Sequence, residues 1–189
     1  MTTRTTQPIW HAAADFAARQ HHGQLRKDGV TPYISHPFRV AMVVQAVFGL
    51  DDPEALAAAV LHDTLEDTRT DYEDLLEAFG PWVTQAVATL SDNKSLPKDE
   101  RIEDYHRRLA DAEPRVLVVK LADAYDNFMD SLPPRGDPSL HAKTRRKGLR
   151  LLDALRHRRD DHPALTRGFA ILEQTLGPAV ASGTPSHAP

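Results

Sequence analysis

The segment PEALAAAVLHDTLED, residues 53–67, joins an apolar helix to a dense group of ionisable side chains. Asp52 and Pro53 are typical of a helix start, because aspartate caps a first turn and proline fits its first position. The alanines and leucines that follow predict a helix to about Leu65. We therefore expect four ionisable residues near the end of a core helix: His62, Asp63, Glu66 and Asp67.

Apolar residues recur at helical spacing through most of the chain, and no strand-like alternation of useful length is present. The pattern predicts a helix opening at Pro114 and further helices over residues 8–22, 37–48, 53–65, 98–112, 139–158 and 163–176. A Thr-x-x-Glu capping box at residues 70–73 predicts another short helix, which ends near Gly80 before Pro81 restarts the chain. The sequence thus predicts an all-α fold, a single helical bundle of roughly eight to ten helices.

Composition limits the classes of function. The 189 residues suggest one domain, and 41% hydrophobic residues can form a real core. A net charge of −4 argues against a dedicated DNA or RNA binder. The chain has no cysteine, which excludes disulfides, iron–sulfur clusters and thiolate zinc sites. Any metal must be held by His, Asp or Glu.

The two ends of the chain differ in what they indicate. The N-terminal MTTRTTQPIW lacks the apolar stretch of a secretion signal, and no apolar run approaches the ~20 residues that cross a bilayer. We expect a soluble cytoplasmic protein with no membrane partner. The C-terminal SGTPSHAP is small and polar, so we predict a domain over residues 1–178 and a disordered tail over residues 179–189. The sequence carries no signal for the oligomeric state.

The ionisable block has a spacing that suits a cation. Glu66 lies four residues after His62, and Asp67 four after Asp63, so the helix would carry two adjacent polar stripes. Three carboxylates this close repel one another unless a cation or bound protons relieve them, and imidazole with carboxylate suits several transition metals. The alternative is a solvated helix end with a capping histidine, although acidic residues there oppose the helix dipole.

Two other positions favour the metal. His36 sits at the start of a helix, and Asp123 lies in a helix whose preceding residues, VLVVKLA, are mostly apolar. A buried carboxylate needs a partner. His36 could instead be an ordinary polar residue of a first turn, and Asp123 could pair with an arginine. Three unusual polar positions in one small helical core favour a shared metal.

The order H…HD…D, formed by His36, His62, Asp63 and Asp123, resembles the HD-domain metal phosphohydrolases. The sequence resembles the hydrolase domain of the RelA/SpoT alarmone enzymes, and most closely the free-standing small alarmone hydrolases, including the Mesh1-type proteins. Four segments carry the resemblance: ADFAARQHHGQLRKDGVTPYISHPFRVA, AAAVLHDTLEDTRTDYEDLLEAFG, SDNKSLPK and VVKLADAYDNF.

The resemblance implies a site and a reaction. It implies that His36, His62, Asp63 and Asp123 bind one manganese ion, and that Glu66 and Asp67 activate or orient the water. It further implies substrate contacts from the basic pair Arg26 and Lys27, from Asn127 at the nucleoside, and from Lys94 and Lys98 at phosphates. The implied reaction is hydrolysis of the 3′-pyrophosphate of ppGpp or pppGpp to GDP or GTP and pyrophosphate.

Two departures leave the substrate open. The family usually reads LADKLYN or LADRLHN where this chain reads LADAYDN, and basic residues within KTRRKGLRLL replace an aromatic residue. The same site could remove the 2′-phosphate of NADPH or act on another nucleotide. A non-catalytic nucleotide-binding module is the third hypothesis. The basic stretch over residues 143–159 could be a solvated surface helix or could add phosphate contacts.

Overall fold

Helices form the architecture of the chain in the computed structural model, which describes residues 7–133 and 136–177. No strand occurs in these residues, apart from an isolated bridge between Leu25 and Pro32. The α-helices are α1 (Ile9–Gln20), α2 (Ser35–Met42), α3 (Pro53–Leu61), α4 (Thr64–Asp67), α5 (Tyr72–Leu90), α6 (Lys98–Ala110), α7 (Pro114–Asp130), α8 (Pro138–Leu155) and α9 (Pro163–Leu176). The predicted all-α fold is confirmed.

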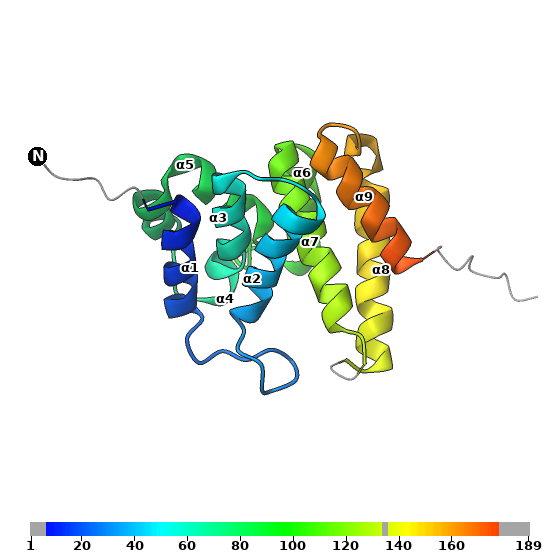
Figure 1. Cartoon of the computed structure of the whole chain (residues 1–189), viewed down its shortest axis with the longest axis horizontal. Coiled ribbons are helices and arrows are strands. Elements are labelled where there is room, and N and C mark those ends of the chain that lie inside the picture. The colour runs from blue at the N-terminus through cyan, green and yellow to red at the C-terminus, as the bar shows by residue number, and fades with distance from the viewer. Residues whose placement is uncertain (1–6, 134–135, 178–189) are drawn as a thin grey trace, which may run out of the picture.

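Two helices, α3 and α7, form the centre of the bundle. Every residue of α3 from Ala55 to Leu61 is buried, and the helix packs against α1, α2, α5 and α7. Alanines at four of these positions let the neighbouring helices approach closely. Helix α7 in turn packs against α2, α8 and α9, so that it lies between α2 and α8 (Figure 1). Asp123 and Asn127 therefore lie on one central helix, and His62 and Asp63 directly follow the other.

The helix predicted over residues 53–65 is shorter than expected. Helix α3 ends at Leu61, and His62 and Asp63 form the junction with α4. The hydroxyl of Thr64 donates to the Leu61 carbonyl at 2.7 Å. Such local side-chain bonds compete with the helical ladder. Each predicted polar stripe therefore begins in this junction and ends in α4, and does not lie on one continuous helix.

The helix predicted to follow residue 70 begins one residue later than the capping box suggested. The N-cap is Asp71, whose side chain accepts from the backbone N–H of Asp74 while Asp74 accepts from that of Asp71. Thr70 is buried instead and contacts Thr68. The predicted interruption at Gly80 occurs inside α5, where Gly80 has φ +78° and kinks the helix.

The other predicted helices agree with the structure within a few residues, except that α2 continues into a π-helical turn, Val43–Val47, and α8 ends in a 3₁₀ turn, Arg156–Arg158. The predicted tail over residues 179–189 and part of the turn after Pro133 lie outside the described residues. In the part of the chain that is described, no helix is both long enough and apolar enough to span a membrane.

Candidate active site

Three separate elements bring four candidate metal ligands together. His36 lies in the first turn of α2, His62 and Asp63 at the α3–α4 junction, and Asp123 in α7. Ligand atoms of His36, His62 and Asp123 all lie within 4.8 Å of one another. Asp63 Oδ2 lies 3.1 Å from His62 Nε2 and 3.6 Å from His36 Nε2. Asp123 Oδ1 lies 3.3 Å from His36 Nε2 and 3.8 Å from His62 Nε2. Both imidazoles thus face both carboxylates.

The outer nitrogen of each imidazole fixes its orientation. His36 Nδ1 lies 2.7 Å from Asp126 Oδ2, and His62 Nδ1 lies 2.8 Å from the Ala59 carbonyl oxygen. Both partners are acceptors, so each Nδ1 carries a proton and donates it. In the neutral ring this leaves the lone pair on Nε2, the atom that faces the cluster. The arrangement presents two imidazole nitrogens and two carboxylates to one point.

The cluster fits a divalent cation. His62 Nε2 is buried and, although Asp63 Oδ2 lies 3.1 Å away, it makes no well-aligned hydrogen bond among the described residues. Burial disfavours a charge on this ring, but the carboxylates of Asp63 and Asp123 outweigh it and raise the pKa of His62 to about 9. Carboxylates that stabilise a proton this strongly would equally stabilise a metal ion. Imidazole with carboxylate is a ligand set that several divalent transition metals accept.

Lys120 and Asn127 hold Asp123 in place. Lys120 Nζ lies 2.9 Å from Asp123 Oδ2, and the amide of Asn127 donates to Oδ1. Burial disfavours the charge on Lys120, but Asp123 and Tyr105 outweigh it and raise the pKa of Lys120 well above its usual value. The lysine therefore remains a cation and orients the carboxylate, whose Oδ1 faces the histidines.

Tyr33 joins the cluster to the second acidic pair. Its hydroxyl lies 2.6 Å from Asp63 Oδ2 and 3.2 Å from Asp67 Oδ2. Burial and the nearby carboxylates raise the pKa of Tyr33 above its usual value, so the hydroxyl stays protonated and donates.

Glu66 Oε2 accepts from the backbone N–H of Asp92 at 3.1 Å, and burial raises the pKa of Glu66.

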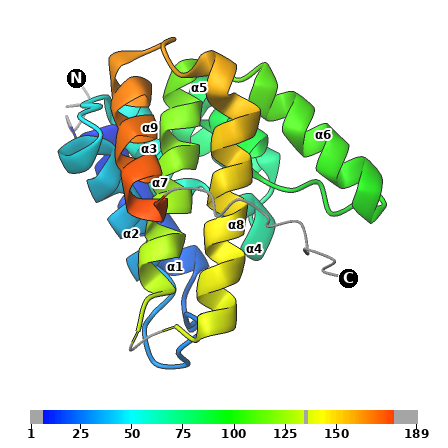
Figure 2. The same ribbon diagram turned by 90° about the vertical axis from the view of Figure 1, so that its right-hand side faces the viewer.

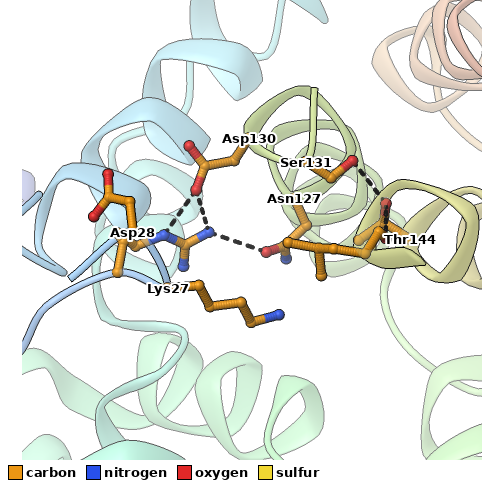
Figure 3. Close-up of a pocket in the computed structure, with 8 residues that line it drawn as sticks. Lys27, Asp28, Asn127, Asp130, Ser131 and Thr144 are labelled. Atoms are coloured by element: carbon orange, nitrogen blue, oxygen red, sulfur yellow. Dashed lines mark hydrogen bonds and ion pairs between the residues drawn. The ribbon is translucent and has the colours of Figure 1, made fainter. Parts of the chain in front are cut away.

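The predicted substrate-binding residues do not all lie together in the structure. Arg26 lies against Asp130 Oδ2 at 2.9 Å and donates to Asn127 Oδ1 at 3.2 Å, while the Lys27 side chain points away from Asp130 (Figure 3). Lys94 Nζ donates to the backbone oxygen of Glu66 at 2.6 Å and lies 3.3 Å from Asp67 Oδ1. Lys98 is the exposed first residue of α6, and the structure does not bring it to the others.

A cavity of about 590 Å³ opens beside the cluster. Its volume lies in the range of small-molecule sites, about 300–1,000 Å³. The candidate ligands all line it, as do Glu66, Lys27 and Asn127, whereas Asp67 and Arg26 do not. Residues of α6 and α8 complete the wall; these helices contact each other near the top of Figure 2 and diverge below. A nucleotide-sized ligand could therefore reach the four candidate metal ligands.

Three supporting residues were not foreseen from the sequence: Tyr33, Lys120 and Asp126. Tyr33 precedes His36 by three residues, and Asp126 follows Asp123 by three, so each lies one turn from a candidate ligand. Asp126 is also a buried carboxylate in a mostly apolar helix, the same signal that identified Asp123. That signal could have been extended to Asp126.

Comparisons with known proteins agree with this geometry. The model of the HD domain family matches residues 13–160. The human protein "Guanosine-3′,5′-bis(diphosphate) 3′-pyrophosphohydrolase MESH1" is 44% identical over 119 residues, which are 62% of this chain and 66% of that protein. The Xenopus tropicalis protein of the same name is 36% identical over 169 residues, 84% of this chain and 94% of its relative.

A solved structure has the same architecture. It is described as "A metazoan ortholog of SpoT hydrolyzes ppGpp and plays a role in starvation responses" and superposes with a TM-score of 0.75 at 29% identity. The match covers 90% of this chain and 97% of that one. The chain therefore belongs to the HD domain family, among the relatives of MESH1.

Proposed function

We propose that this chain is a metal-dependent phosphohydrolase that converts ppGpp or pppGpp to GDP or GTP and pyrophosphate. The observation that carries the proposal is the meeting of two imidazole Nε2 atoms and two carboxylates at the wall of a nucleotide-sized cavity. The MESH1 relatives, whose printed name is that of a 3′-pyrophosphohydrolase, support this choice of substrate.

His36, His62, Asp63 and Asp123 would hold one manganese ion. When bound, a divalent ion supplies a Lewis acid and lowers the pKa of water. Manganese agrees with a set of two imidazoles and two carboxylates and with the absence of any thiolate. Asp126 and the Ala59 carbonyl would keep the two imidazoles in the required tautomer.

Glu66 is our candidate for the general base. It lines the cavity, and its half-buried carboxylate has a raised pKa, which improves its ability to accept a proton near neutral pH. The water oxygen attacks the phosphorus attached to the ribose 3′ oxygen, and Glu66 takes the proton. The bond from that phosphorus to the 3′ oxygen breaks, and the 3′ oxygen leaves as a hydroxyl after protonation. Asp67, held by Tyr33 and Lys94, would orient the water.

Basic residues would offset the charge of the substrate. Lys27 lines the cavity with Asn127, while Arg26 is braced by Asp130 and Asn127 and has its guanidinium carbon 5.3 Å from the centre of the Tyr33 ring. Lys27 supplies positive charge where phosphate charge shifts during the reaction. Lys94, beside the acidic pair, is our further candidate for contacts with phosphate oxygens, and Lys98 stays a prediction from the sequence resemblance.

A second candidate function is removal of the 2′-phosphate of NADPH. Ala124 lines the cavity at a position where the family motif usually has a basic residue, which leaves space on that side for a different nucleotide. The same four ligands and Glu66 would act on the 2′-phosphate monoester. A binding module without catalysis is disfavoured because both the metal ligands and the acidic pair are present.

A nucleotide panel separates these functions. Purified protein with Mn²⁺ is incubated with ppGpp, pppGpp or NADPH, and the products are resolved by anion-exchange chromatography. We expect GDP or GTP together with pyrophosphate. Faster release of inorganic phosphate from NADPH would establish the second function, and nucleotide binding without any product would leave only a binding module.

A further inference from the structure

A row of cations on α8 faces the cavity that contains the candidate metal ligands. Lys143, Lys147 and Arg150 all line this cavity. Their spacing of four and three residues places them on one face of the helix. The basic character of α8 is therefore partly directed at the candidate active site and not only at bulk solvent.

These three cations have no partner within the described ranges, 7–133 and 136–177: no hydrogen bond or ion pair is formed by Lys143, Lys147 or Arg150. Several arginines elsewhere do have partners. Arg39 contacts Asp126 and Arg115 contacts Asp52, for example. Unpaired cations that line a concave cavity are suited to an anionic ligand because like charges in a cleft reinforce one another's field.

Lys27 adds to the positive charge of the same cavity. Burial lowers the pKa of Lys27, and the charges of Lys143, Arg26 and Lys147 lower it further. Lys27 and two of the α8 lysines are therefore close enough to repel one another. A polyanion among them would relieve this repulsion, as a cation would relieve the opposite repulsion at the acidic cluster.

The cavity thus has two sides of opposite charge. Four carboxylates line it near the histidines, those of Asp63, Glu66, Asp92 and Asp123, and the α8 cations line it elsewhere. A metal ion at the acidic side would attract one phosphate group of a ligand. The cationic side would then be left for a separate phosphate group of the same molecule.

We propose that Lys143, Lys147 and Arg150 form a second anion subsite for the phosphate group that is not hydrolysed. This inference rests on the proposed function, which places the 3′-pyrophosphate at the candidate metal ligands. The subsite then takes the 5′-phosphates of the nucleotide. Affinity rises with the number of 5′-phosphates, so the enzyme prefers nucleotides with a 5′-di- or triphosphate to those with a 5′-hydroxyl.

The test measures binding of guanosine, GMP, GDP and GTP by calorimetry, in the presence of Mn²⁺ and at one fixed low salt concentration. The wild type binds each successive nucleotide more tightly. Lys147→Ala and Arg150→Ala each weaken GDP binding about tenfold, the usual scale for a lost charge-assisted contact, and change guanosine binding less than twofold. Added salt reduces the difference between GDP and guanosine.

Arg146→Ala is the matched control. It removes a positive charge from an exposed position of the same helix, but Arg146 does not line the cavity. We expect its binding series to equal that of the wild type. A wild-type series without a gradient, or an equal loss in Arg146→Ala and Arg150→Ala, overturns the subsite.

A second experiment separates this inference from the proposed function. It measures hydrolysis of three guanosine 3′-diphosphates, which carry a 5′-hydroxyl, a 5′-monophosphate or a 5′-diphosphate. If 3′-hydrolysis is observed without any dependence on the 5′ group, the subsite is wrong and the proposed function stands. If the binding gradient and its loss in Lys147→Ala and Arg150→Ala are found without 3′-hydrolysis, the subsite stands and the proposed function is wrong.

Discussion

The Oδ2 atom of Asp126 lies 2.7 Å from Nδ1 of His36, and both side chains are buried. Asp126 also accepts from Arg39 Nε at 2.6 Å and from Arg39 Nη2 at 2.9 Å. Burial disfavours the charge on Asp126, but His36 and Arg39 outweigh it and keep the pKa of Asp126 below its usual value. The ionised carboxylate therefore holds one candidate metal ligand from behind.

Replacing Asp126 should weaken metal binding, although Asp126 is not itself a candidate metal ligand. In Asp126→Asn the neutral amide competes less well for the His36 N–H, because Arg39 also needs the remaining oxygen. We expect Mn²⁺ affinity to fall by about 10–100-fold, the usual effect of losing a partner of a metal-bound histidine. Calorimetric titration with Mn²⁺ measures the change. Asp153→Asn, on the exposed face of α8, is the matched control, and equal affinities in the two variants would contradict the role of Asp126.

Tyr33→Phe removes a donor shared by two carboxylates. The ring can keep its stacking on His21, whose centroid lies 4.8 Å away, while Asp63 and Asp67 lose the hydroxyl. We expect about a tenfold lower kcat and a loss of about 1 kcal/mol in the free energy of unfolding, the scale of one hydrogen bond. Steady-state kinetics and urea unfolding measure both effects. An unchanged kcat would show that Asp67 does not depend on Tyr33.

Glu66→Gln separates catalysis from stability. As the general base, Glu66 should contribute about 10²–10⁴-fold to the rate. Because burial raises the pKa of Glu66, its ionised form costs free energy in the folded state at neutral pH, and glutamine avoids that cost. We expect a large loss of kcat together with an equal or higher Tm. A lower Tm in parallel with the lost activity would indicate a structural role instead.

The pH dependence of the rate follows from the same group. A base with a raised pKa loses activity at a higher pH than an ordinary glutamate as the pH falls. We therefore expect the acidic limb of the kcat profile to lie above the usual pKa of glutamate, about 4.3. Asp92→Asn removes one of the negative charges that raise the pKa of Glu66, so it should shift the limb toward lower pH. A limb that does not move would contradict the assignment.

The sequence predicted the helices well where apolar periodicity was long and was bounded by proline or glycine. Pro114 and Pro163 each start a helix, and Gly80 interrupts α5 as expected. The C-terminal end of α3 and the start of α5 were placed less accurately. There, side-chain bonds from Thr64 and Asp71 decide the boundary, and several neighbouring residues could have formed such bonds.

The site was only partly predictable for a physical reason. Composition and spacing pointed to His62, Asp63 and Asp123 because buried charges need partners. The partners themselves, such as Arg39 for Asp126 and Tyr33 for Asp63, come from elements far apart in the sequence. Their pairing follows from how α2 packs against α3 and α7, which local patterns do not specify.

Gly80→Ala tests the kink in α5. Gly80 has φ +78°, and an added Cβ would meet no atom within 4 Å, so the substitution introduces backbone strain without a clash. We expect a loss of about 1–3 kcal/mol in the free energy of unfolding, because φ +78° with ψ 176° is a backbone conformation that only glycine adopts readily. Urea unfolding measures it. Unchanged stability would mean that the kink straightens at no cost.

The most direct test of the central claim is release of pyrophosphate from ppGpp as a function of added metal. Protein treated with a chelator and dialysed should release none, and Mn²⁺ should restore release up to one ion per chain. Asp63→Ala should remain inactive at every Mn²⁺ concentration while keeping its helical circular dichroism. Absence of turnover at micromolar wild-type enzyme with saturating Mn²⁺, or loss of less than tenfold activity in Asp63→Ala, would contradict the account.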